Sequence, residues 1–233
     1  MEAKTKSNAV FITGGGSGLG AAAAQLLAAQ GWRVGLAGRR SDALQATVST
    51  LKLGAQTYPL DVSDAAALEQ AIRDFRPTAL VCCAAILGQG SVYADLTPAR
   101  FAEVHAINVA GTFNACSAAM RLWYENQLHG DIVNIASLGG IRGMQKFPGF
   151  AAYASSKHAI VGLTEALAIE GRPHNIRINA VAPGTLRTPM IEALGFKPKT
   201  TPDSIAGTIE FLLDRSRSGP ISGTTIEVHC NDD

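Results

Sequence analysis

The chain has 233 residues, of which 47% are hydrophobic and 17% charged, a length that fits one large domain or two small ones. Twenty lysine and arginine residues balance nineteen aspartate and glutamate residues, and no basic run is present, which argues against nucleic-acid and membrane-surface partners. Four cysteines without a C-x-x-C pair give neither a disulfide framework nor a zinc site, and they favour a reducing cytoplasm.

Seven short apolar segments alternate with helical patterns along the chain, and we expect these segments to be strands. They are Ala9–Thr13, Arg33–Ala37, Gln56–Leu60, Ala79–Ala84, Asp131–Ala136, Arg177–Ala182 and Thr224–Val228. Side chains that favour a helix start precede four of the helical patterns, at Ser41, Ser63, Thr97 and Thr201. The alternation predicts an α/β fold, a doubly wound parallel sheet with helices on both faces. No linker or repeat divides residues 1–233, so we expect one domain.

One segment imitates a targeting sequence. Residues 7–32 carry no charge and follow Lys4 and Lys6, as in a signal peptide. However, five glycines between Gly14 and Gly20 would break an apolar helix. We therefore expect a soluble, unprocessed, cytoplasmic protein.

A glycine-rich turn joins the first expected strand to an alanine-rich helix. The residues are Gly14-Gly15-Gly16-Ser17-Gly18-Leu19-Gly20. Backbone N–H groups presented at a helix N-terminus bind phosphate, and side chains would block its approach. The spacing G-x-x-x-G-x-G, with no Gly-Lys-Ser/Thr after it, favours a dinucleotide over a nucleoside triphosphate. A flexible strand-to-helix turn is the alternative.

Two arginines follow the second expected strand, where an NAD site usually places a carboxylate on the ribose hydroxyls. Arg39 and Arg40 suit a 2′-phosphate instead, through charge-assisted hydrogen bonds. NADP(H) is therefore favoured, and NAD(H) is the second choice. A solvated basic pair at a helix start is the alternative.

Tyr153 and Lys157 are four residues apart in a stretch of helical periodicity, so their side chains face the same way. A lysine ammonium about 4 Å from a phenol favours the phenolate by about 4 kcal/mol at an effective dielectric near 20. The pair is thus suited to move a proton near neutral pH. An ordinary surface contact is the alternative.

Two further polar residues are ambiguous on their own. Ser137 follows an expected strand, where its hydroxyl either holds a substrate oxygen or caps the next turn. Asn108 lies inside the helical stretch Pro98–Leu128, where it satisfies a buried backbone group or a water. No cluster of residues has metal-ligand spacing.

Two irregular segments, Leu138–Phe150 and Gly184–Thr200, leave the carboxyl ends of expected strands, where open parallel sheets bind ligands. Six residues of these segments, most of them apolar, suggest a hydrophobic pocket or simple packing. These residues are Leu138, Gln145, Phe147, Phe150, Leu186 and Met190.

Six elements together resemble the short-chain dehydrogenase/reductase family in order and spacing, over essentially the whole chain. They are Thr13-Gly14-x-x-x-Gly18-x-Gly20, Asp61-Val62, Asn108, Ser137, Tyr153-x-x-x-Lys157 and Pro183-Gly184-x-x-x-Thr188. In size the chain is similar to the 3-oxoacyl-carrier-protein reductase branch. The resemblance implies a Rossmann-type fold and an NAD(P)-dependent oxidoreductase that transfers hydride between nicotinamide and a carbonyl or secondary alcohol.

The resemblance also implies the roles of individual residues. Tyr153 would be the acid/base, and Lys157 would lower its pKa and bind the nicotinamide ribose. Ser137 would orient the substrate oxygen, and Asn108 would support a proton-relay water. The expected cofactor residues at the pyrophosphate are Gly14, Gly16, Ser17, Gly18, Leu19 and Gly20. Asp61 and Val62 are expected at the adenine, Arg39 and Arg40 at the 2′-phosphate, and Pro183, Gly184 and Thr188 at the nicotinamide. Ala84, Tyr153 and Lys157 complete the expected cofactor site.

The chain departs from the family pattern in two places. Cys82-Cys83-Ala84-Ala85 stands where the family usually has Asn-Asn-Ala-Gly, and the glycine pair often found after the last strand is missing. The first departure, Ala85 and the missing asparagines, keeps open a rival function, a non-catalytic dinucleotide-binding regulator. An epimerase or dehydratase is disfavoured by the length. The resemblance also implies a homotetramer, or a homodimer, as the assembly.

Overall fold

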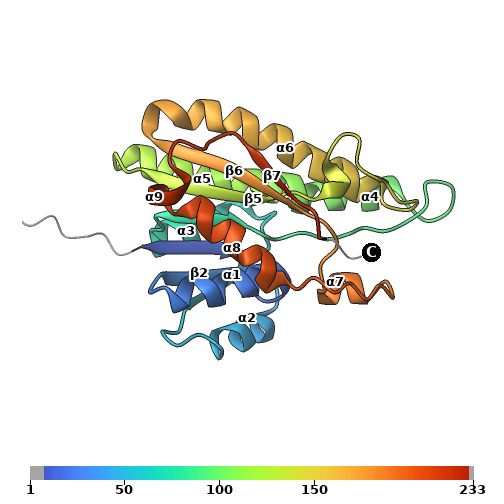
Figure 1. Ribbon diagram of the computed structural model, residues 1–233, viewed down its shortest axis with the longest axis horizontal. Coiled ribbons are helices and arrows are strands. Elements are labelled where there is room, and N and C mark those ends of the chain that lie inside the picture. Colours follow the sequence, from blue (N-terminus) through green and yellow to red (C-terminus); the bar gives the residue numbers. More distant parts are fainter. Residues whose placement is uncertain (1–7, 231–233) are drawn as a thin grey trace, which may run out of the picture.

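The computed structural model describes residues 8–230, in which seven strands form one parallel sheet (Figure 1). The strands are β1 (Ala9–Thr13), β2 (Arg33–Gly38), β3 (Gln56–Pro59), β4 (Ala79–Cys82), β5 (Gly130–Ile135), β6 (Ile176–Pro183) and β7 (Thr225–Val228). All seven predicted strands are confirmed, with ends that differ by at most two residues. The two ends of the predicted domain, 1–7 and 231–233, lie outside the described residues.

Helices connect the strands in the expected order. They are α1 (Gly18–Ala29), α2 (Ser41–Val48), α3 (Ala65–Phe75), α4 (Pro98–His105), α5 (Gly111–Glu125), α6 (Ala151–Gly171), α7 (Pro189–Glu192), α8 (Pro202–Leu213) and α9 (Arg215–Ser218). A π-helical turn, Ala106–Ala110, joins α4 to α5. The part of the chain that the structure describes contains no helix both long and apolar enough to span a bilayer.

The expected helix starts are confirmed at two of the four positions. Thr97 is the N-cap of α4, and Thr201 is the N-cap of α8. The prediction was wrong at Ser63, because the N-cap of α3 is Asp64, which accepts a hydrogen bond from the Ala67 amide. It was also wrong at Ser41, which is already the first helical residue of α2.

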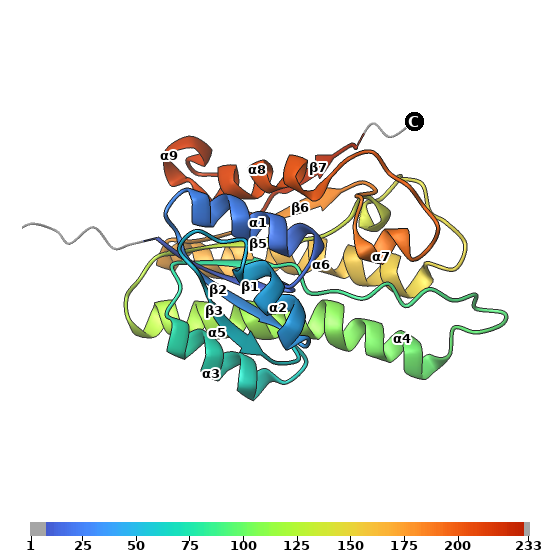
Figure 2. The ribbon, with the colours of Figure 1, turned by 90° about the horizontal axis from the view of Figure 1, so that it is seen from below.

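Helices cover both faces of the sheet, as Figure 2 shows. Side chains of α3, α5 and α6 pack in one core cluster, and side chains of α1, α2 and α8 pack in another. Successive residues of a strand point to opposite faces, so Phe11 enters the first cluster while Val10 and Ile12 enter the second. Burial on both faces explains why the strands have continuous apolar sequences.

The strand order is β3-β2-β1-β4-β5-β6-β7. From β1 the chain adds strands toward one edge of the sheet, and from β4 it adds them toward the other edge. The chain after β1 crosses to one side of the sheet, and the chain after β4 crosses to the other. The two loops therefore separate at the carboxyl ends of these strands and leave a crevice. The fold places the glycine-rich turn and the residues after Cys82 on either side of this crevice.

Candidate active site

The glycine-rich turn is shaped first by the protein's own backbone. A Cβ on Gly14 would lie 2.7 Å from the Ala84 nitrogen, and a Cβ on Gly20 would lie 2.4 Å from the Gly14 oxygen. Gly14 and Gly18 also have positive φ angles, +69° and +54°. Glycine is thus required to pack the turn against the loop after β4 and to start α1.

The N-terminus of α1 faces the crevice without the side-chain partner that usually caps it. Ser17 is the N-cap, and its hydroxyl makes no capping hydrogen bond. First-turn amides that lack such a partner, together with the helix dipole, suit an anion such as a pyrophosphate. This turn therefore fits a dinucleotide.

A cavity of about 520 Å³ begins at this turn and continues across the carboxyl ends of the strands. At one end it is lined by Arg39 and Asp61, and at the other by Ser137, Tyr153 and Lys157. Most of the predicted site residues line it. These are Gly14, Ser17, Gly18, Leu19, Gly20, Arg39, Asp61, Val62, Ala84, Ser137, Tyr153, Lys157, Pro183, Gly184 and Thr188.

Three predicted residues do not line the cavity. Gly16 packs against α2, where a Cβ would lie 3.1 Å from the Ala43 Cβ. Arg40 is exposed and is the N-cap of α2. Asn108 is buried in the π-helical turn between α4 and α5.

Asn108 has every side-chain hydrogen-bonding group engaged by protein atoms nearby. Its Oδ1 accepts from the Ile86 amide at 2.8 Å, and its Nδ2 donates to the Ile86 oxygen at 2.9 Å and to Ser156 Oγ at 3.0 Å. Ser156 Oγ in turn donates to the backbone carbonyl oxygen of Tyr153 at 2.7 Å. Asn108 therefore fastens the loop after β4 to α6, and its support of a relay water stays a prediction.

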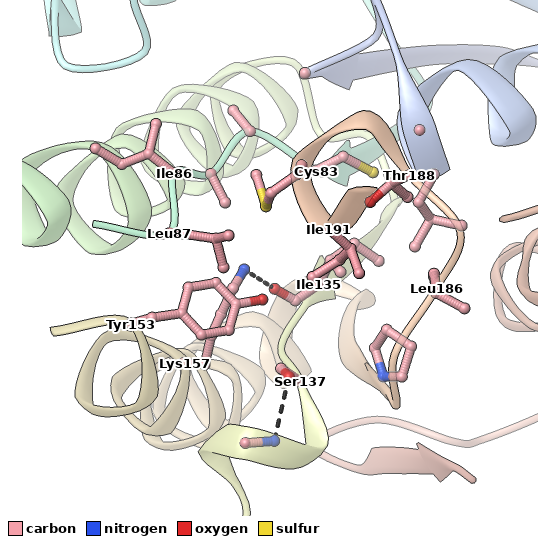
Figure 3. Close-up of a pocket in the computed structure, with 18 of the residues that line it drawn as sticks. Cys83, Ile86, Leu87, Ile135, Ser137, Tyr153, Lys157, Leu186, Thr188 and Ile191 are labelled. Atoms are coloured by element: carbon pink, nitrogen blue, oxygen red, sulfur yellow. Dashed lines mark hydrogen bonds between the residues drawn. The ribbon is translucent and has the colours of Figure 1, made fainter. Parts of the chain in front are cut away.

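Tyr153, Lys157 and Ser137 converge on the cavity, as Figure 3 shows. Helix α6 carries Tyr153 and Lys157 one turn apart, and the Lys157 nitrogen lies 5.7 Å from the centre of the Tyr153 ring. That nitrogen donates a hydrogen bond of 2.7 Å to the Ile135 oxygen at the end of β5. The arrangement holds the ammonium next to the phenol inside the protein.

Ser137 caps the turn after β5, and its contact with a substrate oxygen stays a prediction. Its Oγ accepts a hydrogen bond of 3.2 Å from the Gly139 amide, which caps the turn after β5. The same hydroxyl also acts on Tyr153, whose pKa it lowers. Capping fixes the hydroxyl where it faces the phenol.

Burial governs the ionisation of this site. It raises the pKa of Tyr153 above its ordinary value, and the effect of the Ser137 hydroxyl offsets only part of this shift. This direction is opposite to the predicted lowering by Lys157. Burial also lowers the pKa of Lys157 to about 8, although electrostatic interaction with Cys83 and Cys82 opposes the shift. The tyrosine is thus protonated at neutral pH.

The opposite end of the cavity carries a cation and a carboxylate. Arg39 Nη1 lies 4.0 Å from Asp61 Oδ2. Burial alone would raise the pKa of Asp61, but hydrogen bonds from the Ser63 amide and hydroxyl, together with the charge of Arg39, lower it. Asp61 is therefore ionised at neutral pH. More than half of the Arg39 side chain is exposed to solvent.

Sequence reasoning missed several residues that line the cavity. They are Cys83, Ile86, Leu87, Lys146, Ile191, Leu194 and Phe196. Cys83, Ile86 and Leu87 follow the carboxyl end of β4, and this position at a strand end could have indicated that they line the site. Lys146, Leu194 and Phe196 lie in irregular segments and Ile191 in the four-residue helix α7, all too short or too irregular for periodicity to show which way a side chain points. In the described residues, no group of three or more His, Cys, Asp or Glu is placed to hold a metal ion.

Comparison with known proteins identifies the family. The family model described as short chain dehydrogenase matches residues 8–198. The chain belongs to the short-chain dehydrogenase family. It is 39% identical over 193 residues to levodione reductase from Leifsonia aquatica, a match that covers 78% of this chain and 71% of that protein.

Solved structures of the same family carry either dinucleotide. A short chain dehydrogenase from Mycobacterium paratuberculosis bound to NAD has a TM-score of 0.85 and 29% identity, over 97% of each chain. ElxO with NADP bound has a TM-score of 0.84 and 26% identity, over 96% of this chain and 98% of that one. As a short-chain dehydrogenase, the present chain is an NAD(P)-dependent oxidoreductase that acts on CH–OH groups.

Proposed function

We propose that this short-chain dehydrogenase uses NADP(H) to interconvert a carbonyl compound and its secondary alcohol, with Tyr153 as the general acid and base. The observation that carries the proposal is the cavity itself, which joins the glycine-rich turn and Arg39 to the cluster of Ser137, Tyr153 and Lys157. A dinucleotide lying along the cavity would place its reactive ring beside the phenol. NADPH, when bound, supplies the hydride.

The chain's own residues handle the substrate oxygen. In the direction of reduction, the Tyr153 hydroxyl donates its proton to the oxygen as negative charge develops there. Ser137 donates a hydrogen bond to the same oxygen and so orients the carbonyl. Lys157, in its protonated form, stabilises the phenolate that results. The raised pKa of Tyr153 supports reduction at neutral pH, because it keeps the acid protonated.

Arg39 supports the choice of NADP(H). Its side chain lines the cavity at the end of β2, where no carboxylate is available for the ribose hydroxyls on that strand. Asp61, which faces the same region, is 4.0 Å from Arg39 at its closest approach. An exposed guanidinium suits a 2′-phosphate, which it can bind through two parallel hydrogen bonds.

Enzyme assays with a matched pair of variants test the proposal. Wild-type protein mixed with NADPH and a panel of ketones and aldehydes should oxidise NADPH. Tyr153→Phe should bind NADPH in calorimetry as the wild type does, but lose turnover by about 10²-fold or more, because the phenolic proton is missing. Tyr93→Phe is the control, because Tyr93 is 99% exposed and does not line the cavity. NADPH binding without turnover on any carbonyl would favour the rival regulator.

The same proposal includes one domain over residues 1–233, a cytoplasmic location and a homotetramer. The four free cysteines support a reducing compartment. The exposed side chains of Phe113 on α5 and Ile169 on α6 support association through these helices. Light scattering at micromolar concentration should return a tetramer, and a monomer would contradict this assembly.

A further inference from the structure

The end of the cavity beyond Tyr153 is apolar. Its walls come from the segment after β5 and the segment around α7, and they include Leu138, Phe147, Phe150, Met190, Ile191 and Phe196. Phe147 and Phe196 are 54% and 50% exposed, although both are large and hydrophobic. Exposed aromatic side chains on the two segments mark the mouth through which an apolar substrate enters.

A second groove adjoins this mouth. It is lined by Arg187, Glu192, Gly195, Phe196, Lys197, Pro198 and Lys199. Phe196 lines both the cavity and the groove, so the two hollows meet at this side chain. The groove presents three cationic side chains and one carboxylate. Within residues 8–230, neither Arg187 nor Lys197 forms an ion pair, so both can meet an external anion.

The opposite wall of the mouth is also basic. Lys146 lines the cavity there and is exposed, and its Nζ donates to the Ile141 and Met144 backbone oxygens at 2.7 and 2.8 Å, which fixes it at the rim. The segments 138–150 and 184–199 together carry five cationic residues and one acidic residue, in a chain whose net charge is only +1. Positive charge is therefore concentrated around the entrance for substrate.

We propose that the substrate of this enzyme has an apolar portion that bears the reacting carbonyl and an anionic group, a carboxylate or a phosphate, that lies in the groove against Arg187 and Lys197. The inference rests on the proposed function and adds the substrate class. Arg187 can bind either anion through two parallel hydrogen bonds, whereas Lys197 acts as a point charge. The Glu192 carboxylate in the same groove repels an anion, but the groove is lined by more cationic side chains than carboxylates.

Matched substrates test the inference in two arms. One arm compares medium-chain oxo-fatty acids, over a series of chain lengths, with their methyl esters. The other compares a β-ketoacyl thioester of 4′-phosphopantetheine with the same thioester of pantetheine. In at least one arm, the anionic member should have a kcat/KM about tenfold higher at low salt, and the ratio should approach one at high salt because exposed charges are screened. The arm that shows the preference identifies the anion.

Two variants locate the effect. Arg187→Gln and Lys197→Gln should each reduce the preference for the anionic member about three- to tenfold, as expected for exposed ion pairs. Both should leave kcat/KM for the neutral member and the KM for NADPH unchanged. Arg121→Gln, on an exposed position of α5, is the control and should leave the preference intact.

The outcomes distinguish this inference from the proposed function. Equal kcat/KM for the anionic and neutral members would overturn the inference and leave the reductase function standing. An increase in the KM for NADPH in Arg187→Gln, with no change in preference, would assign the groove to the cofactor and also overturn it. No turnover of any member by a protein that binds NADPH would overturn both.

Discussion

Replacing Lys157 by methionine should make the protein more stable at neutral pH while it abolishes activity. Lys157 is only 3% exposed, and burial lowers its pKa from 10.5 to about 8. At pH 7 the lysine is charged in both the folded and the unfolded chain, so the folded state carries the whole cost of burying the ammonium. At 1.36 kcal/mol per pKa unit, this cost is about 3 kcal/mol.

Methionine keeps most of the length of the side chain and removes the charge. The substitution also removes the hydrogen bond to the Ile135 oxygen. Loss of that bond costs about 1 to 2 kcal/mol, so the net gain in the free energy of unfolding at pH 7 is about 1 to 2 kcal/mol.

The pH dependence is the sharper measurement. Between the folded pKa of about 8 and the unfolded pKa of 10.5, the unfolded wild-type chain binds more protons than the folded chain, so wild-type stability rises with pH. Lys157→Met lacks this rise. The advantage of the variant over the wild type should therefore fall by about 2 kcal/mol between pH 7 and pH 10.

Urea denaturation of both proteins at the two pH values, without added dinucleotide, measures this difference. Lys52→Met is the control, because Lys52 is exposed and its replacement should show no such pH dependence. An advantage of Lys157→Met that stays constant from pH 7 to pH 10 would refute the assignment of a buried, destabilising charge to Lys157.

Three further substitutions probe other parts of the structure. Arg39→Gln should raise the KM for NADPH about 10- to 100-fold and leave the KM for NADH nearly unchanged, since it removes a charged partner of the 2′-phosphate; equal effects on both would contradict the role of Arg39. Ser156→Ala should lower kcat several-fold, which corresponds to about 1 kcal/mol in the activation barrier, because the Asn108 amide loses a hydrogen-bond acceptor. Ser155→Ala, at an exposed neighbouring position, should leave kcat unchanged. Asp131→Asn should lower the free energy of unfolding by about 3 kcal/mol, because the buried carboxylate accepts from two arginine side chains at 2.7 and 2.8 Å; a loss below 1 kcal/mol in urea titrations would show that those charges find other partners.

The sequence by itself determined the strands and the pairing of Tyr153 with Lys157 in the site. Continuous apolar segments such as Ala9–Thr13 mark strands buried on both faces, and their alternation with helices restricts the chain to a parallel sheet. The spacing of Tyr153 and Lys157 places them on one face of α6 wherever that helix packs. These features depend on neighbours within a few residues, so local sequence is sufficient to predict them.

Only the tertiary structure decided how those residues behave. The hydrogen bonds that join Asn108 with Ile86 and with Ser156 connect residues that are 22 and 48 positions apart in the chain. The pKa of Tyr153 is raised rather than lowered, because the surroundings that desolvate the phenol come from other segments. The cations near Phe147 and Phe196 likewise gather from two loops that have no periodic pattern. Burial and charge depend on everything that packs around a group, and that depends on the whole fold.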